Sequence, residues 1–134
     1  LTYVAIVLSI FKLLPVTLSA AAIAGFVISI GLAVDGNILI FERLKEELKN
    51  GLSIKEAIEK AFGRAWTSIR DSNIASLIVA VILFFIGTSV VQGFALTLMI
   101  GVLTSMFSSV VVTRTILKMI ATNKIGKFFW KSPF

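Results

Sequence analysis

One carboxylate, Asp35, stands inside a long apolar stretch of this 134-residue chain, and no other residue has a clearer potential for chemistry. Residues 17–41 carry no other charge. A carboxylate within a membrane span costs about 2.5–3.5 kcal/mol on insertion scales, so it normally faces protein or water and serves a function. A carboxyl group in such surroundings can take up and release a proton at physiological pH. We therefore expect Asp35 to exchange protons. The alternative is a structural ion pair with Arg70 or Arg114 near the inner leaflet.

Other reactive side chains are scarce. The chain has no cysteine and no histidine, which excludes disulfides, thiolate sites, and the commonest metal ligand and general base. It also has no glycine-rich phosphate loop and no cluster with metal-ligand spacing. Asp71 and Asn73 introduce a later apolar run, where they serve either as polar partners of Asp35 or only as a helix N-terminal cap. We expect neither an enzyme nor a metal site.

The composition is that of a membrane protein. Hydrophobic residues make up 57% of the chain, charged residues make up 15%, and the mean hydropathy is +1.01. Soluble domains are about 45–50% apolar and about 25% charged. The net charge is +6. Because the basic residues flank apolar runs, we interpret this charge as marking the cytoplasmic side of a bilayer and expect no nucleic-acid partner.

The apolar runs predict an all-α, polytopic transmembrane helix bundle. We expect spans at about residues 1–14, 17–41, 74–91 and 94–120. The first is only the second half of a helix, because a span needs roughly 20 residues. The second helix should continue to a left-handed cap at Asn50-Gly51. Residues 1–134 are then a C-terminal transmembrane fragment of a longer protein, and residues 121–134 form a basic, aromatic tail.

An amphipathic helix is predicted between the second and third spans, at residues 53–69. Ser53 and Glu56 have the spacing of a capping box, and apolar residues recur every three or four positions from Ile54 to Ile69. Trp66 suits the depth of lipid headgroups. We expect a cytoplasmic helix that lies at the membrane surface; the alternative is a helix that packs on a protein core.

Basic residues predict the orientation of the chain. The connection at residues 43–70 carries seven of them and the C-terminal region five, whereas the opposite loops carry only Lys12. By the positive-inside rule, the loop at 43–70 and the C-terminus are cytoplasmic.

Small residues recur every four positions in two of the spans, as is typical of membrane helices that pack closely. Each set forms a smooth ridge, on which we expect another helix to approach. The two ridges are Ala21, Gly25, Ser29, Ala33 and Asn37, and Gly93, Thr97, Gly101, Ser105 and Ser109.

Four motifs stand in order along the spans: Gly31-Leu-Ala-Val-Asp35-Gly-Asn37-Ile-Leu-Ile-Phe41-Glu42-Arg43, Asp71-x-Asn73-Ile74, Gly93-Phe94-Ala95-Leu-Thr97 and Thr113-Arg114. Together they resemble the SecD family, the membrane subunits of bacterial protein export. The resemblance covers residues 17–119. Departures from the family's usual residues are Gly36 in place of Ala, Ala75-Ser76 in place of Thr-Thr, and Ser89 in place of Gly.

The resemblance implies a function and its partners. Such a subunit belongs to the resistance-nodulation-division superfamily, and this chain would hold part of its third span and spans four to six. With SecF, it would use the proton-motive force to promote late preprotein translocation through SecYEG after SecA, as a multi-pass protein of the bacterial inner membrane. Protons would be the coupling ion, with no other cofactor. The family's relay acid falls on Asp35, and its candidate partners are Asn37, Arg70, Asp71, Asn73 and Arg114.

Two other functions compete with this interpretation. A proton-driven efflux or lipid transporter of the same superfamily would share the bundle, but the motifs around Asp35 and Asp71 count against it. A structural membrane scaffold would make Asp35 dispensable.

Overall fold

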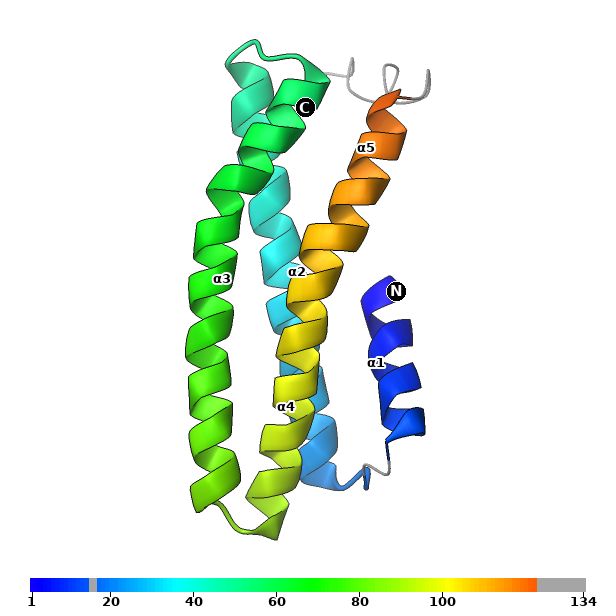
Figure 1. Ribbon diagram of the computed structural model, residues 1–134, viewed down its shortest axis with the longest axis vertical. Helices are drawn as coiled ribbons and strands as arrows, with labels where there is room; N and C mark the ends of the chain where they lie inside the picture. The colour runs from blue at the N-terminus through cyan, green and yellow to red at the C-terminus, as the bar shows by residue number, and fades with distance from the viewer. Residues whose placement is uncertain (15–16, 123–134) are drawn as a thin grey trace.

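The computed structural model describes residues 1–14 and 17–122, with side chains up to residue 119, and this part of the chain is helical and contains no strand (Figure 1). Three of its helical stretches are long and apolar enough to cross a membrane, namely Ala20–Lys49, Ile54–Ile86 and Ser89–Met119. The all-α, multi-span architecture expected from the sequence is therefore confirmed.

Five α-helices and one π-helical segment make up the described residues. The elements are α1 (Thr2–Leu13), α2 (Ala20–Lys49), α3 (Ile54–Ile86), α4 (Ser89–Phe107), the π-helix η1 (Ser108–Thr113) and α5 (Arg114–Thr122). Helices α2, α3 and α4 run side by side along the long axis, and α5 continues the line of α4 (Figure 1). Helix α1 packs against α2 and α4.

The turn between α2 and α3 has the caps that the sequence predicts. Gly51 adopts φ 83°, a left-handed conformation that favours glycine, and its N–H donates to the Leu48 carbonyl at 3.1 Å. In the next helix, Ser53 Oγ accepts from the Glu56 N–H at 3.4 Å, and Glu56 Oε2 accepts from the Ser53 N–H at 3.3 Å. This reciprocal capping box begins α3, which runs antiparallel to α2 (Figure 1).

The structure differs from the expected boundaries after this turn. Residues 54–69 of the predicted surface helix and residues 74–86 of the predicted span belong to one continuous helix, α3. The boundary expected between the spans at 74–91 and 94–120 falls earlier, because α3 ends at Ile86 and α4 begins at Ser89. The apolar face of residues 54–69 packs against α2 and Leu117 of α5, so protein covers it. Its placement at a membrane surface stays a prediction, and most of the basic tail, residues 123–134, lies outside the described residues.

The most extensive contact joins α2 and α4, where the two rows of small residues face each other. A Cβ atom at Gly101 would collide with the Ser29 side chain. At Gly25, a Cβ atom would collide with Thr97 Oγ1 and lie 2.6 Å from the Phe94 carbonyl oxygen. Nothing larger than hydrogen fits at either glycine, so the two backbones approach as closely as van der Waals contact allows.

Helix α1 is held to this contact by a hydroxyl group. Tyr3 Oη donates a hydrogen bond to Ser29 Oγ at 2.7 Å and lies 3.2 Å from the Gly101 carbonyl oxygen. Farther along α1, Phe11 and Phe26 meet edge to face with ring centroids 5.7 Å apart. One short helix therefore touches both partners of the central contact.

A carboxylate is buried between two cations near the α2–α3 turn. The Glu47 side chain is 1% exposed, its Oε1 accepts a hydrogen bond from Arg64 Nη1 at 2.6 Å, and its Oε2 lies 3.1 Å from Lys60 Nζ. The hydrogen bond from Arg64 lowers the pKa of Glu47 below its usual value, and this effect outweighs burial, which raises it. These two ion pairs join the C-terminal end of α2 to the first turns of α3.

The contact between α2 and α4 generates a stability prediction. Gly101→Leu should destabilise the bundle by about 3 kcal/mol, because the new side chain has to displace Ser29. Gly31→Leu is the matched control: a Cβ atom there meets nothing within 4 Å, so the change should stay within about 0.5 kcal/mol. Thermal unfolding of the detergent-purified protein measures both, and equal tolerance of the two substitutions would contradict the packing argument.

The Glu47 ion pair predicts a pH dependence. Because the folded-state pKa of Glu47 is lowered, its contribution to stability is present above about pH 4.5 and is lost as pH falls through the folded-state value. Glu47→Gln should lower the melting temperature at pH 7 and remove this part of the acid sensitivity. Melting curves from pH 3 to 8 test this. A mutant whose melting temperature falls as steeply with acid as the wild type would contradict it.

Candidate functional site

Asp35 lies on α2 at the edge of a cavity of about 190 Å³ between α2 and α3. Its lining includes Ile69, Ser72 and Asn73 of α3. In the described part of the chain, Asp35 has neither a hydrogen-bond partner nor an ion-pair partner. It precedes Glu42 by seven residues, so it stands about 10 Å inside the boundary at which α2 becomes charged.

The side chains facing Asp35 from α3 are polar but uncharged. Asn73 is 4% exposed, and its amide Nδ2 donates to the Ile69 carbonyl at 2.7 Å. Ser72 Oγ donates to the same carbonyl at 3.1 Å. These groups supply hydrogen-bonding capacity beside the carboxylate without neutralising it, which suits a site where water and a proton enter.

The expected charged neighbours of Asp35 are paired elsewhere. Arg70 Nη2 lies 2.9 Å from Asp71 Oδ1, and Arg114 Nη2 lies 3.8 Å from Glu59 Oε1. The structural alternative, in which Asp35 pairs with Arg70 or Arg114, is thus not what the structure contains. Asp71 and Asn73 also do not cap a helix, because they lie in the middle of α3.

Asn37 belongs to a second polar contact, between α2 and the π-helix. Thr113 Oγ1 donates to Asn37 Oδ1 at 3.0 Å and lies 3.3 Å from the Ser108 carbonyl oxygen. A Cβ atom at Gly36 would lie 3.4 Å from Ser109 Oγ, a buried hydroxyl without a hydrogen-bond partner in the described residues. Gly36 and Asn37, which follow Asp35 along α2, therefore face the part of the span where the α-helix widens.

The π-helix Ser108–Thr113 beside the candidate site was not predicted from the sequence. π-Helical turns inside α-helices are rare and occur frequently at functional sites. The run Val110-Val-Val-Thr113 is a usable signal, since β-branched side chains fit an α-helix poorly.

The remaining small residues line the helix interface rather than the Asp35 cavity. Ala33 and Ser105 are buried, and Ser105 Oγ has no hydrogen-bond partner within the described range. The packing around Gly93 is looser, because a Cβ atom there would lie 3.5 Å from Ser19 Oγ, an ordinary van der Waals distance. In the described residues no group of three or more acidic side chains is placed to hold a metal ion.

Residues 1–123 match the family described as protein export membrane protein SecD/SecF, C-terminal. The chain belongs to the SecD/SecF C-terminal family. The protein translocase subunit SecD of Thermobaculum terrenum is 50% identical to this chain, and the match covers 96% of this chain and 26% of the relative. The SecD subunit of Dehalococcoides mccartyi is 51% identical, and the match covers 93% of this chain and 29% of the relative.

A solved structure shares the fold of this SecD/SecF chain. The crystal structure of SecDF, a translocon-associated membrane protein from Thermus thermophilus, matches with a TM-score of 0.85 and 43% identity, covering 89% of this chain and 17% of that one. The chain spans under a third of the length of the relatives cited here. The resemblance to SecD is confirmed, and the relatives cited are named as translocase subunits, not as efflux or lipid transporters.

The contact between Thr113 and Asn37 generates a prediction for this SecD/SecF chain. Thr113→Val keeps the shape but removes the hydroxyl, so it should lower stability by about 1 kcal/mol. Thr115→Val is the control: its hydroxyl bonds only the Val111 carbonyl of its own helix and is exposed, so its loss should cost under about 0.5 kcal/mol. Equilibrium unfolding in detergent measures the free energy of unfolding of both variants. A larger loss of stability in Thr115→Val than in Thr113→Val would contradict a stabilising hydrogen bond between Thr113 and Asn37.

Proposed function

We propose that this chain is the SecD-type transmembrane part of a proton-driven subunit of protein export. It works with SecF to promote late preprotein translocation through SecYEG after SecA has acted. Membership of the SecD/SecF family supports the export role. The single observation that supports the proton role is the placement of Asp35, a carboxylate without a counter-ion in the described residues, on a cavity inside an apolar span.

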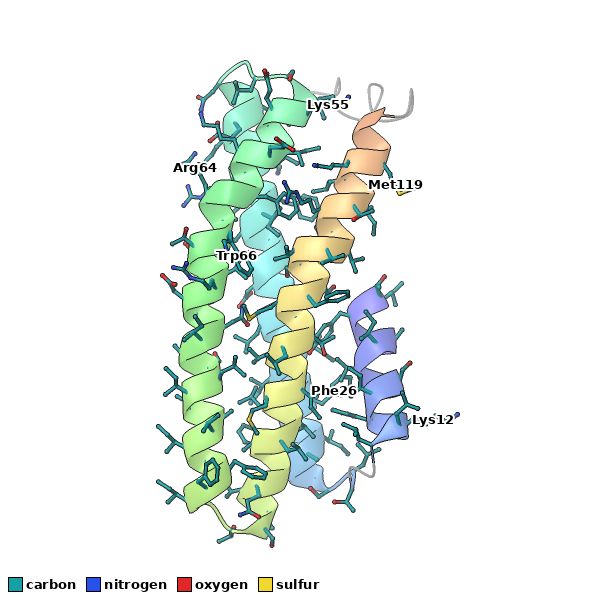
Figure 2. The ribbon with its side chains drawn as sticks, viewed as in Figure 1. Lys12, Phe26, Lys55, Arg64, Trp66 and Met119 are labelled. Atoms are coloured by element: carbon teal, nitrogen blue, oxygen red, sulfur yellow. The ribbon has the colours of Figure 1, made fainter. Side chains whose placement is uncertain are left out.

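The proposed orientation places the loop at 43–70 and the C-terminus in the cytoplasm of a bacterial cell. Figure 2 supports it by showing Lys55 and Arg64 at one end of the bundle, with Met119 of α5, and Lys12 toward the other. The positive-inside rule then assigns the end rich in cations to the cytoplasm. The apolar side chains exposed along the outer faces of the helices suit lipid and a membrane partner such as SecF.

In the proposed mechanism, a proton enters from water in the α2–α3 cavity and binds the Asp35 carboxylate. Protonation removes a negative charge from an apolar region, and release restores it. Helix α2 carries this charge change, and α2 packs against α3, α4 and the π-helix, so the packing of the bundle responds. One charge crossing 100 mV is worth about 2.3 kcal/mol, which shifts a two-state equilibrium about fifty-fold.

Substitution at Asp35 tests the proposal. Asp35→Asn keeps the size and polarity but cannot titrate, so export stimulated by a proton gradient should fall to the level without the gradient. Asp35→Glu should retain part of the stimulation. The measurement is preprotein translocation into membrane vesicles with and without an imposed gradient, using the full-length protein with its partners.

Glu42→Gln is the matched control, because it removes an exposed carboxylate from the same helix outside the apolar run. It should leave the stimulation near the wild-type level. If the Asp35→Asn protein inserts normally and supports export at the wild-type rate under the gradient, Asp35 is structural and the proposal fails.

A further inference from the structure

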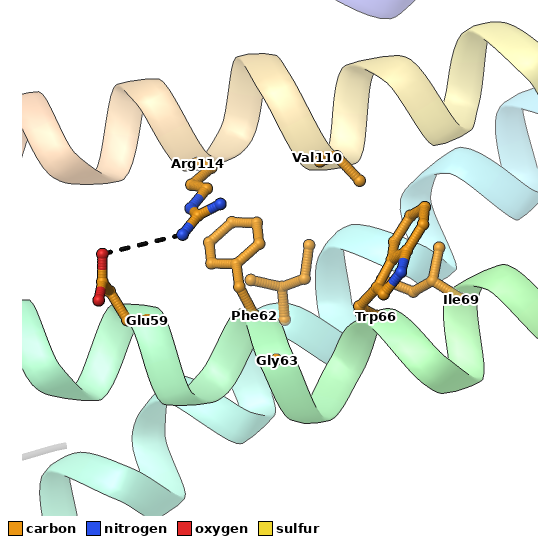
Figure 3. A pocket seen from close by; sticks show the side chains of 8 residues that line it. Glu59, Phe62, Gly63, Trp66, Ile69, Val110 and Arg114 are labelled. Atoms are coloured by element: carbon orange, nitrogen blue, oxygen red, sulfur yellow. Dashed lines mark ion pairs between the residues drawn. The ribbon is translucent and has the colours of Figure 1, made fainter.

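A second cavity, of about 180 Å³, lies between α3 and the α4–α5 line, with Ile40 of α2 also in its wall (Figure 3). It shares Ile69 with the first cavity, but Asp35 does not line it. Apolar side chains form most of its wall, and Trp66 and Phe62 of α3 face Val110 of the π-helix across it. Glu59 and Arg114 stand at one end, joined as an ion pair (Figure 3). The cavity is therefore an apolar groove with a charged end.

Arg114 has unused hydrogen-bonding capacity at that end. Its side chain is 42% exposed, its guanidinium lies 5.9 Å from the centre of the Phe62 ring, and its nearest carboxylate oxygen, on Glu59, is 3.8 Å away. That distance is too long for a hydrogen bond. Within the described residues Arg114 donates no hydrogen bond, although a guanidinium has five N–H donors.

The carboxylate at this end is already shared. Lys118 Nζ lies 3.0 Å from Glu59 Oε1, the same oxygen that Arg114 approaches. Two cations thus flank one carboxylate at the mouth of the groove. The hydrogen bond from Lys118 lowers the pKa of Glu59, so this carboxylate stays ionised at neutral pH and its ion pair with Arg114 persists.

The level of the groove along the bundle suits a lipid headgroup. Trp66 is 37% exposed and stands where the charged first half of α3 gives way to its apolar second half. Tryptophan is enriched at the headgroup level of membranes. Basic pockets between spans on the cytoplasmic side are suited to anionic headgroups, because phosphate oxygens accept the paired N–H donors of arginine.

We propose that this groove binds an anionic phospholipid of the cytoplasmic leaflet. The lipid phosphate accepts hydrogen bonds from Arg114, and the first segment of one acyl chain lies along Phe62, Trp66 and Val110. The cavity is smaller than the roughly 300–1,000 Å³ of sites that enclose a small molecule, which fits a ligand whose remainder stays in the bilayer. The lipid also links α3 to the α4–α5 line.

Native mass spectrometry of the full-length protein tests this inference. Protein in mild detergent is incubated with equal amounts of phosphatidylglycerol and phosphatidylcholine, and the lipid retained is counted. The wild type should retain phosphatidylglycerol preferentially. Arg114→Gln should reduce that retention about ten-fold, the effect of losing one charge-assisted hydrogen bond. Lys45→Gln removes an exposed charge from α2 and should leave retention unchanged.

Gly63 offers an independent test of the groove itself. It lines the cavity, and a Cβ atom there meets nothing within 4 Å, so a side chain can be added without disturbing the fold. Gly63→Leu fills the groove and should reduce lipid retention strongly, whereas Gly63→Ala should reduce it only slightly. Thermal unfolding confirms that each variant is folded, and Gly63→Leu keeps the test decisive if Arg114→Gln does not fold.

Three outcomes would overturn the inference. Equal losses in Arg114→Gln and Lys45→Gln would show diffuse electrostatic attraction. Displacement of the lipid by millimolar inorganic phosphate would show a phosphate site that needs no acyl chain. Full retention in Gly63→Leu would show that the groove is not used. Lipid retention is measured without export, so a failure here is distinct from a failure of the Asp35 proposal.

Discussion

The bundle depends on the close approach of α2 and α4. Gly25 and Gly101 place each backbone against a polar side chain or carbonyl of the other helix, and no Cβ atom is tolerated at either position. In a bilayer, where apolar side chains gain little by leaving lipid, such contact between backbones is a main source of helix association. Because α2 carries Asn37 and α4 leads into the π-helix, this contact also brings Asn37 within hydrogen-bond distance of Thr113.

The sequence was sufficient for the parts of the fold that local rules determine. The Gly51 cap and the capping box at Ser53 depend on a few adjacent residues, and the apolar runs exceed the length of a span. The continuity of α3 was missed because its first half is amphipathic and its second half apolar, and a change of pattern resembles a boundary. The backbone has no such boundary, since neither proline nor glycine interrupts residues 64–86.

The sequence singles out the central residue of the candidate site but not the residues that surround it. Asp35 stands out by chemistry alone, as one charge in an apolar run. Its neighbours depend on how α2 and α3 are rotated about their axes, which no local pattern encodes. Arg114 and Arg70 were attractive partners by charge, yet each lies beside a different carboxylate. The ion pairs between described residues lie from Arg43 onward along α2, from Glu59 to Asp71 along α3, or on α5, and Asp35 takes part in none of them.

The π-helix at Ser108–Thr113 alters the helical phase of everything that follows it. A π-turn accommodates one extra residue, which is equivalent to a rotation of about 100° for the residues beyond it. With that offset, Leu117 faces the apolar cluster of α2 and α3, and Lys118 reaches Glu59. In an uninterrupted α-helix, these side chains would point about a quarter of a turn away. One inserted residue in the middle of a span therefore decides which face of α5 meets the rest of the protein.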